Sequence, residues 1–448
     1  MKIKTLLFVT LAILSVTFSA CKKNTEPPNN VTFKDLKVPA DFTWSNINRL
    51  NLLANITDLN GNISHALDNQ PLDLLDMEGN IMQRLAVDQA SVEFYLMIDM
   101  VTTKVKLFSP VTQQTLEVDV FAGSVNFPTS LSKSALHQTD TDHDGIADEF
   151  DAFPLDPGRA FTNAFPYTTK ALKEYPSGAN YYFQIYEDLW PSMGDYDFND
   201  LILANKLTWD YDAKNYIVGG SVTSKIWAIG ESPDFPHGLG METLKSSSSK
   251  RYYLPAATVN FSAGSIPQSH QDARMNNGVV MWDNIFEVLQ PYYNNVGGDW
   301  GVMGVPKTVS YSYTMPASVK VKTVGIFSYL FNTEIPSWQI RTFGAPPASY
   351  ADMALFRTGN DYSATTWNWA TGSYFTYPLK GENAFYRTAT NLPWGIEFIY
   401  SNFKVPIETT SILLAYPRFQ AWAESGGTKE KTWYKYPDPN HTLIVPEN

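Results

Sequence analysis

The chain has 448 residues, 44% of them hydrophobic, 14% aromatic and only 17% charged, so it is long and apolar enough to form more than one packed core. Its formal net charge of −12 repels the phosphates of nucleic acids, which excludes nucleic acid as an expected partner. Its 28 prolines, 26 glycines, 25 tyrosines and 26 phenylalanines favour short strands joined by turns. The composition therefore predicts an all-β fold.

Residues 1–20 have the pattern of an export signal. Lys2 and Lys4 precede an apolar run, residues 5–20, that is shorter than a membrane-spanning helix and ends in small residues. Residues 18–21 (FSAC) resemble the lipobox of bacterial lipoproteins, and this resemblance implies cleavage before Cys21 and lipidation of that cysteine. Ordinary secretory cleavage is the alternative. Because Cys21 is the only cysteine, we expect no disulfide and no cysteine chemistry.

The next two segments differ in pattern. Residues 21–38 are polar and contain a proline pair, which predicts a lipidated, flexible tether. Residues 39–128 contain short alternating runs such as 92–96 (VEFYL) and 103–107 (TKVKL), separated by glycine- and asparagine-containing turn signals. This pattern predicts a small N-terminal β-sandwich. Its opening resembles immunoglobulin- or transthyretin-like modules, which usually act as spacers on cell-surface proteins.

An aspartate-rich run dominates the following segment, residues 129–158. Calcium takes six to eight oxygen ligands, and a loop supplies them when carboxylates recur at every second residue around a glycine-enabled turn. With Asp140 as position 1, Gly145 falls at position 6 and every ligand position is filled. Close aspartates repel one another unless a cation lies between them, which favours a calcium loop over an acidic linker. The predicted ligands are Asp140, Asp142, Asp144, the Ile146 carbonyl, Asp148 and Asp151.

The residues after this loop exclude an EF-hand. Pro154 follows within three residues of the last ligand and prevents the long exiting helix that an EF-hand requires. The aspartate run together with residues 154–157 (PLDP) instead resembles one copy of a thrombospondin type 3 calcium repeat.

A second acidic group lies in residues 187–200. If residues 195–199 are extended, the acidic and amide side chains share one face while Tyr196 and Phe198 point into the core. This group is either a second calcium site, alone or shared with the first loop, or a turn whose Asx side chains bond local amides. The candidate ligands are Glu187, Asp188, Asp195, Asp197, Asn199 and Asp200.

Several motifs are similar to those of LruC-domain proteins, a family of envelope lipoproteins. They include residues 186–191 (YEDLWP), 194–200 (GDYDFND), 237–240 (HGLG), 392–394 (LPW) and 419–427 (FQAWAESGG). The resemblance covers about residues 140–434, and it assigns residues 159–448 to a C-terminal β-rich domain of this kind. The resemblance implies a location in the cell envelope and a β-rich architecture, and it implies no particular biochemical activity.

The sequence contains none of the common catalytic motifs, and its six histidines are far apart, so we expect that the protein is not an enzyme. His237, beside glycines, is interpreted as a turn residue. A glycoside hydrolase is the remaining enzymatic alternative, because such an enzyme needs only two carboxylates near aromatic residues. The residues available for it are Glu334, Glu397 and Glu408 beside Trp338, Trp367, Trp369 and Trp394.

Two non-enzymatic interpretations remain. The first is a structural, adhesive or interaction role in the cell envelope, with calcium rigidifying the junction between the two domains. The second is the binding of a glycan or another ligand through exposed aromatic residues of the C-terminal domain. The first requires buried tryptophans and a metal site at the junction, whereas the second requires tryptophans exposed in one groove. In both cases we expect lipid on Cys21 to hold the protein at the outer membrane, on its periplasmic side or at the surface.

Overall fold

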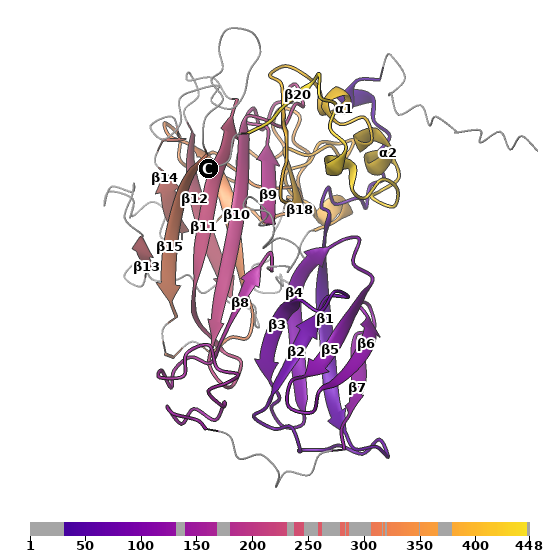
Figure 1. Ribbon diagram of the computed structural model, residues 1–448. Helices are drawn as coiled ribbons and strands as arrows, with labels where there is room; N and C mark the ends of the chain where they lie inside the picture. Colours follow the sequence, from indigo (N-terminus) through magenta and orange to yellow (C-terminus); the bar gives the residue numbers. More distant parts are fainter. Residues whose placement is uncertain are drawn as a thin grey trace, which may run out of the picture.

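The computed structural model describes residues 31–130, 139–167, 180–230, 237–245, 259–261, 278–282, 284–285, 306–315, 317–318, 320–348, 350–365 and 379–445. Nearly all regular structure in these segments is β-strand, which confirms the predicted all-β fold (Figure 1). The predicted export signal and Cys21 lie outside the described residues. Within the described segments, no helix has the length and apolar character needed to cross a membrane.

The N-terminal part is a sandwich of two sheets. Its strands are β1 Ile47–Thr57, β2 Pro71–Leu75, β3 Ile81–Ala86, β4 Ser91–Asp99, β5 Lys104–Ser109, β6 Gln114–Asp119 and β7 Ser124–Pro128. One sheet has the order β4-β1-β7, and β7 runs parallel to β1. The other has the order β3-β2-β5-β6 and is antiparallel throughout. The alternating run at 92–96 lies in β4 and the run at 103–107 overlaps β5, as their period of two indicates.

The C-terminal part is built on two further sheets. Its strands are β8 Phe161–Phe165, β9 Tyr181–Tyr186, β10 Leu201–Tyr211, β11 Ile217–Ile229, β12 His237–Lys245, β13 Val259–Phe261, β14 Gly278–Trp282, β15 Lys307–Thr314, β16 Val324–Asn332, β17 Gln339–Ile340 and β18 Gly395–Tyr400. The larger sheet has the order β13-β15-β11-β10-β9-β18, with β8 also paired to β10, and the smaller has the order β14-β12-β16-β17. Tyr186 of β9 and Ser328 of β16 share a 2.8 Å hydrogen bond, so the two sheets face each other. His237 begins β12, so its interpretation as a turn residue is wrong.

A small aromatic-rich unit follows β18 and lies above the sandwich (Figure 1). It contains β19 Val405–Pro406, α1 Ile412–Ala415, α2 Phe419–Glu424, the 3-10 turn η10 Trp433–Lys435 and β20 Thr442–Leu443, and a further turn, η9 Gly381–Asn383, precedes β18. Trp422 and Trp433 are fully buried, with ring centroids 5.4 Å apart. The burial of such large side chains stabilises this unit.

The chain enters this aromatic unit before the sandwich begins. Residues Phe33–Asp35 form the turn η1, and Phe33 stacks on Tyr196 with ring centroids 4.1 Å apart. Phe33 and Leu36 are each only 3% exposed. The flexible tether was predicted over residues 21–38, but residues 33–36 are folded against the aromatic unit, because burial of their apolar side chains stabilises the fold.

Two asparagine side chains join the sandwich to the large sheet. Asn163 of β8 accepts a hydrogen bond from the amide of Arg84 (2.8 Å) and donates to its carbonyl (3.1 Å). Asn215, in the turn after β10, makes the same pair of bonds with Ala86 at 2.9 and 2.8 Å. Both asparagines are buried. They occupy the free edge of β3 as another strand would, and they hold the two parts of the chain together.

Replacing Asn163 or Asn215 with alanine is expected to lower the free energy of unfolding by about 2 kcal/mol, because a buried amide and carbonyl of β3 lose their partners. Urea unfolding of each variant measures the effect. Asn60→Ala, in an exposed turn of the sandwich, is the matched control. Unchanged stability in both buried variants would show that these bonds do not form in solution.

Candidate metal centre

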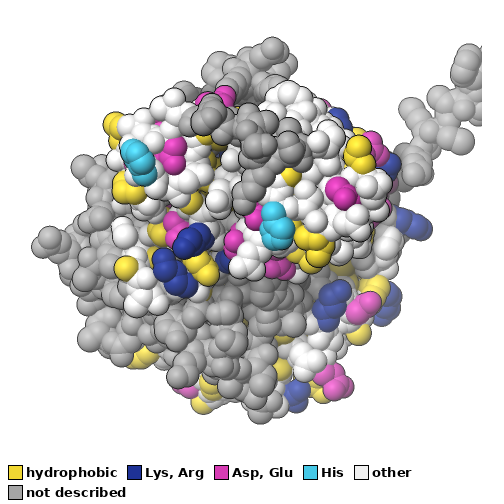
Figure 2. Space-filling view, turned by 90° about the horizontal axis from the view of Figure 1, so that it is seen from below, with side chains coloured by type: hydrophobic (Ala, Val, Ile, Leu, Met, Phe, Trp, Pro, Cys, Tyr) yellow, Lys and Arg dark blue, Asp and Glu magenta, His cyan; other side chains and the backbone are white. Residues whose placement is uncertain are grey.

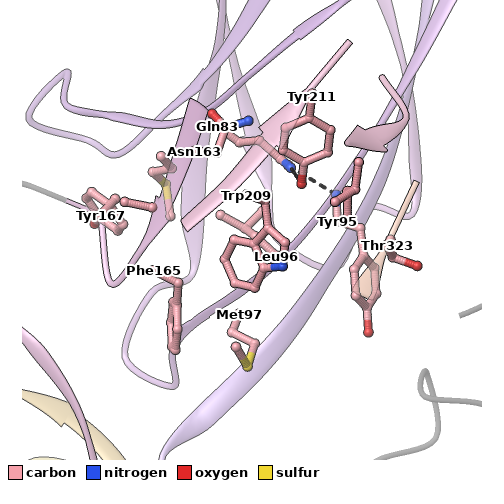
Figure 3. A pocket seen from close by; sticks show the side chains of 13 residues that line it. Gln83, Tyr95, Leu96, Met97, Asn163, Phe165, Tyr167, Trp209, Tyr211 and Thr323 are labelled. Carbon is pink, nitrogen blue, oxygen red and sulfur yellow. Dashed lines mark hydrogen bonds between the residues drawn. The ribbon is translucent and has the colours of Figure 1, made fainter. Parts of the chain in front are cut away.

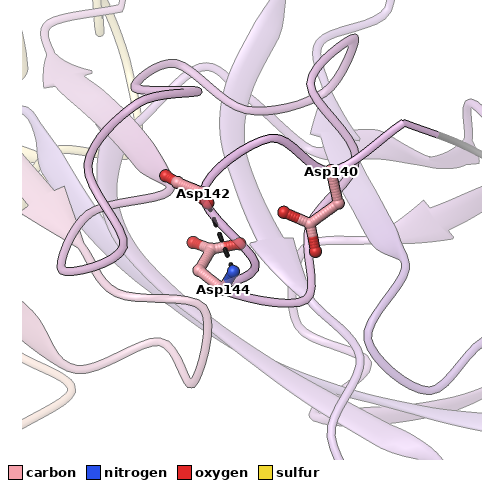
Figure 4. Close-up of side chains that lie close together, drawn as sticks. All are labelled: Asp140, Asp142 and Asp144. Carbon is pink, nitrogen blue, oxygen red and sulfur yellow. Dashed lines mark hydrogen bonds between the residues drawn. The ribbon is translucent and has the colours of Figure 1, made fainter.

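The structure brings three of the predicted calcium ligands together. Carboxylate oxygens of Asp140, Asp142 and Asp144 lie within 4.8 Å of one another, and Figure 4 shows the three side chains around the same turn. Gly145 makes this turn with φ of +104°, a conformation that residues with a Cβ rarely adopt. Asp140 Oδ2 accepts the Gly145 amide (3.0 Å) and Asp144 Oδ1 accepts the Ile146 amide (2.8 Å), so the loop's own backbone orients the carboxylates.

Three carboxylate oxygens in this loop are buried without a hydrogen-bond partner. They are the Oδ2 atoms of Asp142, Asp144 and Asp151. In each residue the other oxygen, Oδ1, accepts a backbone amide two residues further along the chain, at 3.2, 2.8 and 2.6 Å respectively. A buried carboxylate oxygen without a partner costs at least about 1–3 kcal/mol, and more when it is charged. Three such oxygens in one loop are chemically suited to the ligand shell of a hard cation.

The charge balance of the loop favours a cation. Burial, followed by repulsion from Asp151, Asp142 and Asp140, raises the pKa of Asp144 to about 6. Burial and neighbouring aspartates also raise the pKa of Asp151. Among the described residues, no lysine or arginine forms an ion pair with Asp140, Asp142, Asp144 or Asp151. Protons or a bound cation would relieve the repulsion between these carboxylates.

Two other predicted ligands are placed differently. Both carboxylate oxygens of Asp148 accept bonds from Thr141, one from its amide and one from its hydroxyl, each at 2.7 Å. These bonds lower the pKa of Asp148, and they give this carboxylate a structural partner that the spacing did not predict. The side chain of Ile146 is 1% exposed and anchors the loop in the core, whereas the role of its carbonyl as a ligand stays a prediction.

The loop lies at the junction between the sandwich and the large sheet. The guanidinium of Arg84, on β3 of the sandwich, lies 5.9 Å from the centre of the Phe150 ring. The end of the loop is tied to β10 by the amides of Ala152 and Ala160, which donate to the carbonyls of Ala160 (2.8 Å) and Tyr211 (2.7 Å). Turns follow the loop through residue 158, so the expectation that no helix follows is confirmed.

The second acidic group lies between β9 and β10. Carboxylate oxygens of Glu187, Asp195 and Asp197 lie within 4.8 Å of one another. Glu187 is fully buried, and its carboxylate accepts the amides of Tyr196 (3.0 Å) and Phe198 (2.8 Å). Burial, followed by repulsion from Asp195, raises the pKa of Glu187 to about 8. A cation could therefore bind here only in competition with protons.

The backbone of this group differs from the sequence expectation. Residues 195–200 form no strand, and Tyr196 and Phe198 have φ of +63° and +56°, so the predicted single face of oxygens is wrong. Tyr196 and Phe198 are buried as expected, but Asp197 between them is also fully buried.

The remaining members of the second group bond to nearby backbone. Asp197 accepts the amides of Asn199 (3.1 Å) and Thr409 (2.9 Å), and Asp200 accepts the amide of Asp188 (2.8 Å). The side chain of Asn199 donates to the carbonyl of Pro406 (3.1 Å). Burial raises the pKa values of Asp197 and Asp200 well above their usual range. The bond from Asn199 to Asp197 is a local Asx bond, whereas those with Thr409 and Pro406 join segments far apart in the sequence. Cation binding at this group stays a prediction.

The carboxylate of Glu397, a residue of the glycosidase alternative, lies in the core. Glu397 is 3% exposed and accepts hydrogen bonds from Ser45 (2.8 Å) and from the hydroxyl of Tyr182. Ser45 directly precedes the sandwich, so this carboxylate joins the sandwich to β18. Of the other residues of that alternative, Trp394 is fully buried, Glu334 is exposed, and Trp367 and Trp369 lie outside the described residues.

The described tryptophans are mostly buried. Trp338 and Trp209 are partly exposed. Those that are at most 1% exposed are Trp44, Trp190, Trp227, Trp394, Trp422 and Trp433.

A pocket lies between the sandwich and the large sheet (Figure 3). Gln83 and Tyr95 of the sandwich meet Trp209 and Tyr211 of β10 there, and Gln83 donates to the Tyr211 hydroxyl at 3.4 Å. Its volume of about 40 Å³ holds only a few water molecules. An adjoining pocket of about 290 Å³ opens beside Glu93, Lys320 and Lys322.

Charges of both signs are mixed on one face of the molecule. Figure 2 shows acidic and basic side chains interspersed on the face seen from below, with hydrophobic side chains in small groups. A basic face of the kind that binds nucleic acid is not visible among the described residues of this view.

Comparison with known proteins gives a family match for about half of the chain. Residues 215–434 match the model of a domain of unknown function, DUF4842. The crystal structure of a candidate lipoprotein from Bacteroides ovatus is similar with a TM-score of 0.50 and 14% sequence identity, over 84% of this chain and 100% of that chain. At this identity the likeness shows the fold alone.

A full-length structure of the RrgB pilus protein from Streptococcus pneumoniae has 6% identity and a TM-score of 0.15, over 65% of this chain and 49% of that chain, which is too low for any inference. No curated protein matches the chain.

Proposed function

We propose that the protein is a non-enzymatic, calcium-binding lipoprotein of the cell envelope with a structural, adhesive or interaction role. In this proposal, calcium bound by the Asp140 loop fixes the orientation of the N-terminal sandwich on the C-terminal sheets. The observation that carries it is the set of buried, unpartnered Oδ2 atoms of Asp142, Asp144 and Asp151 beside Asp140. Calcium, a hard cation with an all-oxygen shell, fits this donor set, whereas zinc prefers nitrogen and sulfur.

The position of the loop supports a structural role for the cation. The loop contacts Arg84 of the sandwich through Phe150 and is bonded to β10 through Ala160. A cation that draws the aspartates together would also fix these two attachments, because they lie in or directly after the same loop. The burial of six tryptophans matches the requirement of the structural interpretation.

The envelope assignment rests on different support. Residues 18–21 resemble a lipobox, so lipid on Cys21 would anchor the chain, and the outer membrane is the proposed location. The similarity to a candidate lipoprotein and to a domain of unknown function agrees with membership of the LruC-domain lipoproteins.

Ligand binding is the second candidate function. The pocket of about 290 Å³ at the junction has Lys320 and Lys322 near the ring of Tyr216, which together suit a polar ligand such as a glycan. A glycan array on the full chain tests this candidate. Binding that is lost in Tyr216→Ala would favour it, and an array without hits would remove it.

Calorimetric titration of calcium into the chelator-stripped full chain tests the first proposal. We expect saturable binding that is lost when Asp142 and Asp144 are both replaced by alanine. Glu149→Ala is the matched control, because Glu149 is an exposed acidic residue of the same loop that the spacing does not make a ligand. A titration without heat, or equal binding in the double variant, would show that the loop is only an acidic linker.

The affinity for calcium is expected to fall below about pH 6. Asp144 has a pKa of about 6 without the cation, so its protonated form is increasingly populated below that pH and calcium must displace the proton. Above pH 7 the carboxylate is already ionised, and the affinity should become independent of this group. Repeating the titration at pH 5 and pH 7.5 measures the difference, and equal affinities would place the cation away from Asp144.

A further inference from the structure

A buried arginine in the loop region before β18 forms no ion pair with the part of the chain that the structure describes. Arg387 is only 6% exposed, and its Nε atom is buried without a hydrogen-bond partner. Its guanidinium forms no ion pair with any described residue. Burial also lowers the pKa of Arg387, as it does for any cation that loses its hydration. Taking a guanidinium out of water costs several kcal/mol unless an acceptor replaces the water.

Asp361 acts on Arg387 electrostatically, but its carboxylate makes its hydrogen bonds with other donors. Its Oδ1 atom accepts the amides of Arg357 (2.8 Å) and Ser363 (3.0 Å). Its Oδ2 atom accepts the indole N–H of Trp190 (2.8 Å) and the hydroxyl of Ser363 (2.7 Å). A carboxylate has about four acceptor positions, so all those of Asp361 are filled. Glu382, the other acidic residue that acts on Arg387, is exposed and screened by solvent.

A second arginine approaches the same aromatic ring. The guanidinium carbons of Arg357 and Arg387 lie 4.5 and 5.3 Å from the centre of the Tyr362 ring. Arg357 uses its Nε to donate to the Ser363 carbonyl (2.9 Å) and is itself exposed. Contact between a cation and an aromatic ring stabilises by about 0.5–2 kcal/mol, which is less than the cost of burying the Arg387 charge and does not offset the repulsion between the two arginines.

We propose that Arg387, Arg357 and Tyr362 form a binding site for the oxyanion of a small ligand, namely a carboxylate, sulfate or phosphate group. The planar guanidinium of Arg387 supplies paired donors that match such a group, and Arg357 adds a second positive charge at the exposed side. Tyr362, which is 44% exposed, and the exposed Arg357 lie at the solvent side of the site, so a ligand would reach the buried guanidinium of Arg387 from that side. This site is separate from the proposed calcium loop and does not depend on it.

Calorimetric titrations of the full chain with sodium sulfate, sodium phosphate and sodium acetate test the site, with ionic strength held constant by sodium chloride. We expect saturable one-to-one binding of at least one of these anions. Arg387→Gln should weaken it at least about tenfold, because a charge-assisted bidentate contact is lost. Arg357→Gln should weaken it less, about threefold, because Arg357 is exposed and screened. The anion that binds most tightly identifies the oxyanion type.

Arg418→Gln is the matched control. The guanidinium carbon of Arg418 also lies over a tyrosine ring, 3.4 Å from the centre of Tyr436, but Arg418 is paired with Glu430 at 3.0 Å. Its replacement should leave anion binding unchanged. If Arg387→Gln does not fold, the anion affinities of Arg357→Gln and Arg418→Gln are compared instead, and weaker binding in Arg357→Gln alone supports the site. No saturable binding to any of the three anions, or equal affinities in the wild type and the Arg387 and Arg357 variants, would overturn the proposal.

Discussion

Replacing Gly194 with alanine is expected to lower the free energy of unfolding by about 3 kcal/mol. A Cβ atom at this position would lie 1.8 Å from the Glu187 carboxylate oxygen that accepts the Tyr196 amide. The carboxylate would have to move, and the buried amides of Tyr196 and Phe198 would lose their acceptor. Urea unfolding followed by tryptophan fluorescence measures the effect.

Gly158→Ala is the control for this substitution. A Cβ at Gly158 meets only the Asp156 carboxylate, at 3.3 Å, which belongs to a partly exposed side chain that can shift by a few tenths of an ångström. Its effect should stay within about 0.5 kcal/mol, as at other surface sites. Equal stabilities of the two variants would mean that Glu187 does not occupy the space beside Gly194.

Chelation of calcium is expected to lower the melting temperature by about 3 °C relative to protein with calcium at a hundredfold excess over its dissociation constant. Without the cation, the buried carboxylates of Asp142, Asp144 and Asp151 lose their partner and repel one another. Differential scanning calorimetry with and without chelator measures the shift.

The variant with both Asp142→Ala and Asp144→Ala separates this effect from general salt effects. It removes the repulsion between the carboxylates together with two oxygen ligands of the proposed site, so its melting should not respond to the chelator. Magnesium should stabilise the wild type less than calcium, because it demands a smaller, octahedral shell. Equal responses of the variant and the wild type to chelation would place the stabilising cation elsewhere.

Short sequence patterns correctly predicted a strand, a turn and the absence of a helix, because each of these depends on residues close together in the chain. The alternation at 92–96 gave β4, because a period of two places successive side chains on opposite faces of a strand. The aspartates around Gly145 lie in a turn with their carboxylates together, because that spacing and one glycine suffice to bring them there. Pro154 excluded a following helix for an equally local reason.

The contacts that the sequence did not predict join residues far apart in the chain. Asn163 and Asn215 gave no signal as partners of β3, because their bonds depend on how the sandwich docks on the large sheet. Glu397 was a candidate for the glycosidase alternative, but its carboxylate is buried and accepts hydrogen bonds from Ser45 and Tyr182. Phe33 was predicted to belong to the tether, because its aromatic partner, Tyr196, lies far away in the sequence. Burial of these side chains follows from topology, which periodicity alone does not fix.

A crystal structure of the protein grown with calcium tests the central claim most directly. The proposal predicts an ion beside Asp140, Asp142, Asp144 and Asp151, with six to eight oxygen ligands at roughly 2.3–2.6 Å that include the three Oδ2 atoms now without partners. Anomalous scattering identifies the ion as calcium. A loop that keeps these carboxylates without an ion at saturating calcium would contradict the proposal, and the aspartate run would then be a solvated linker.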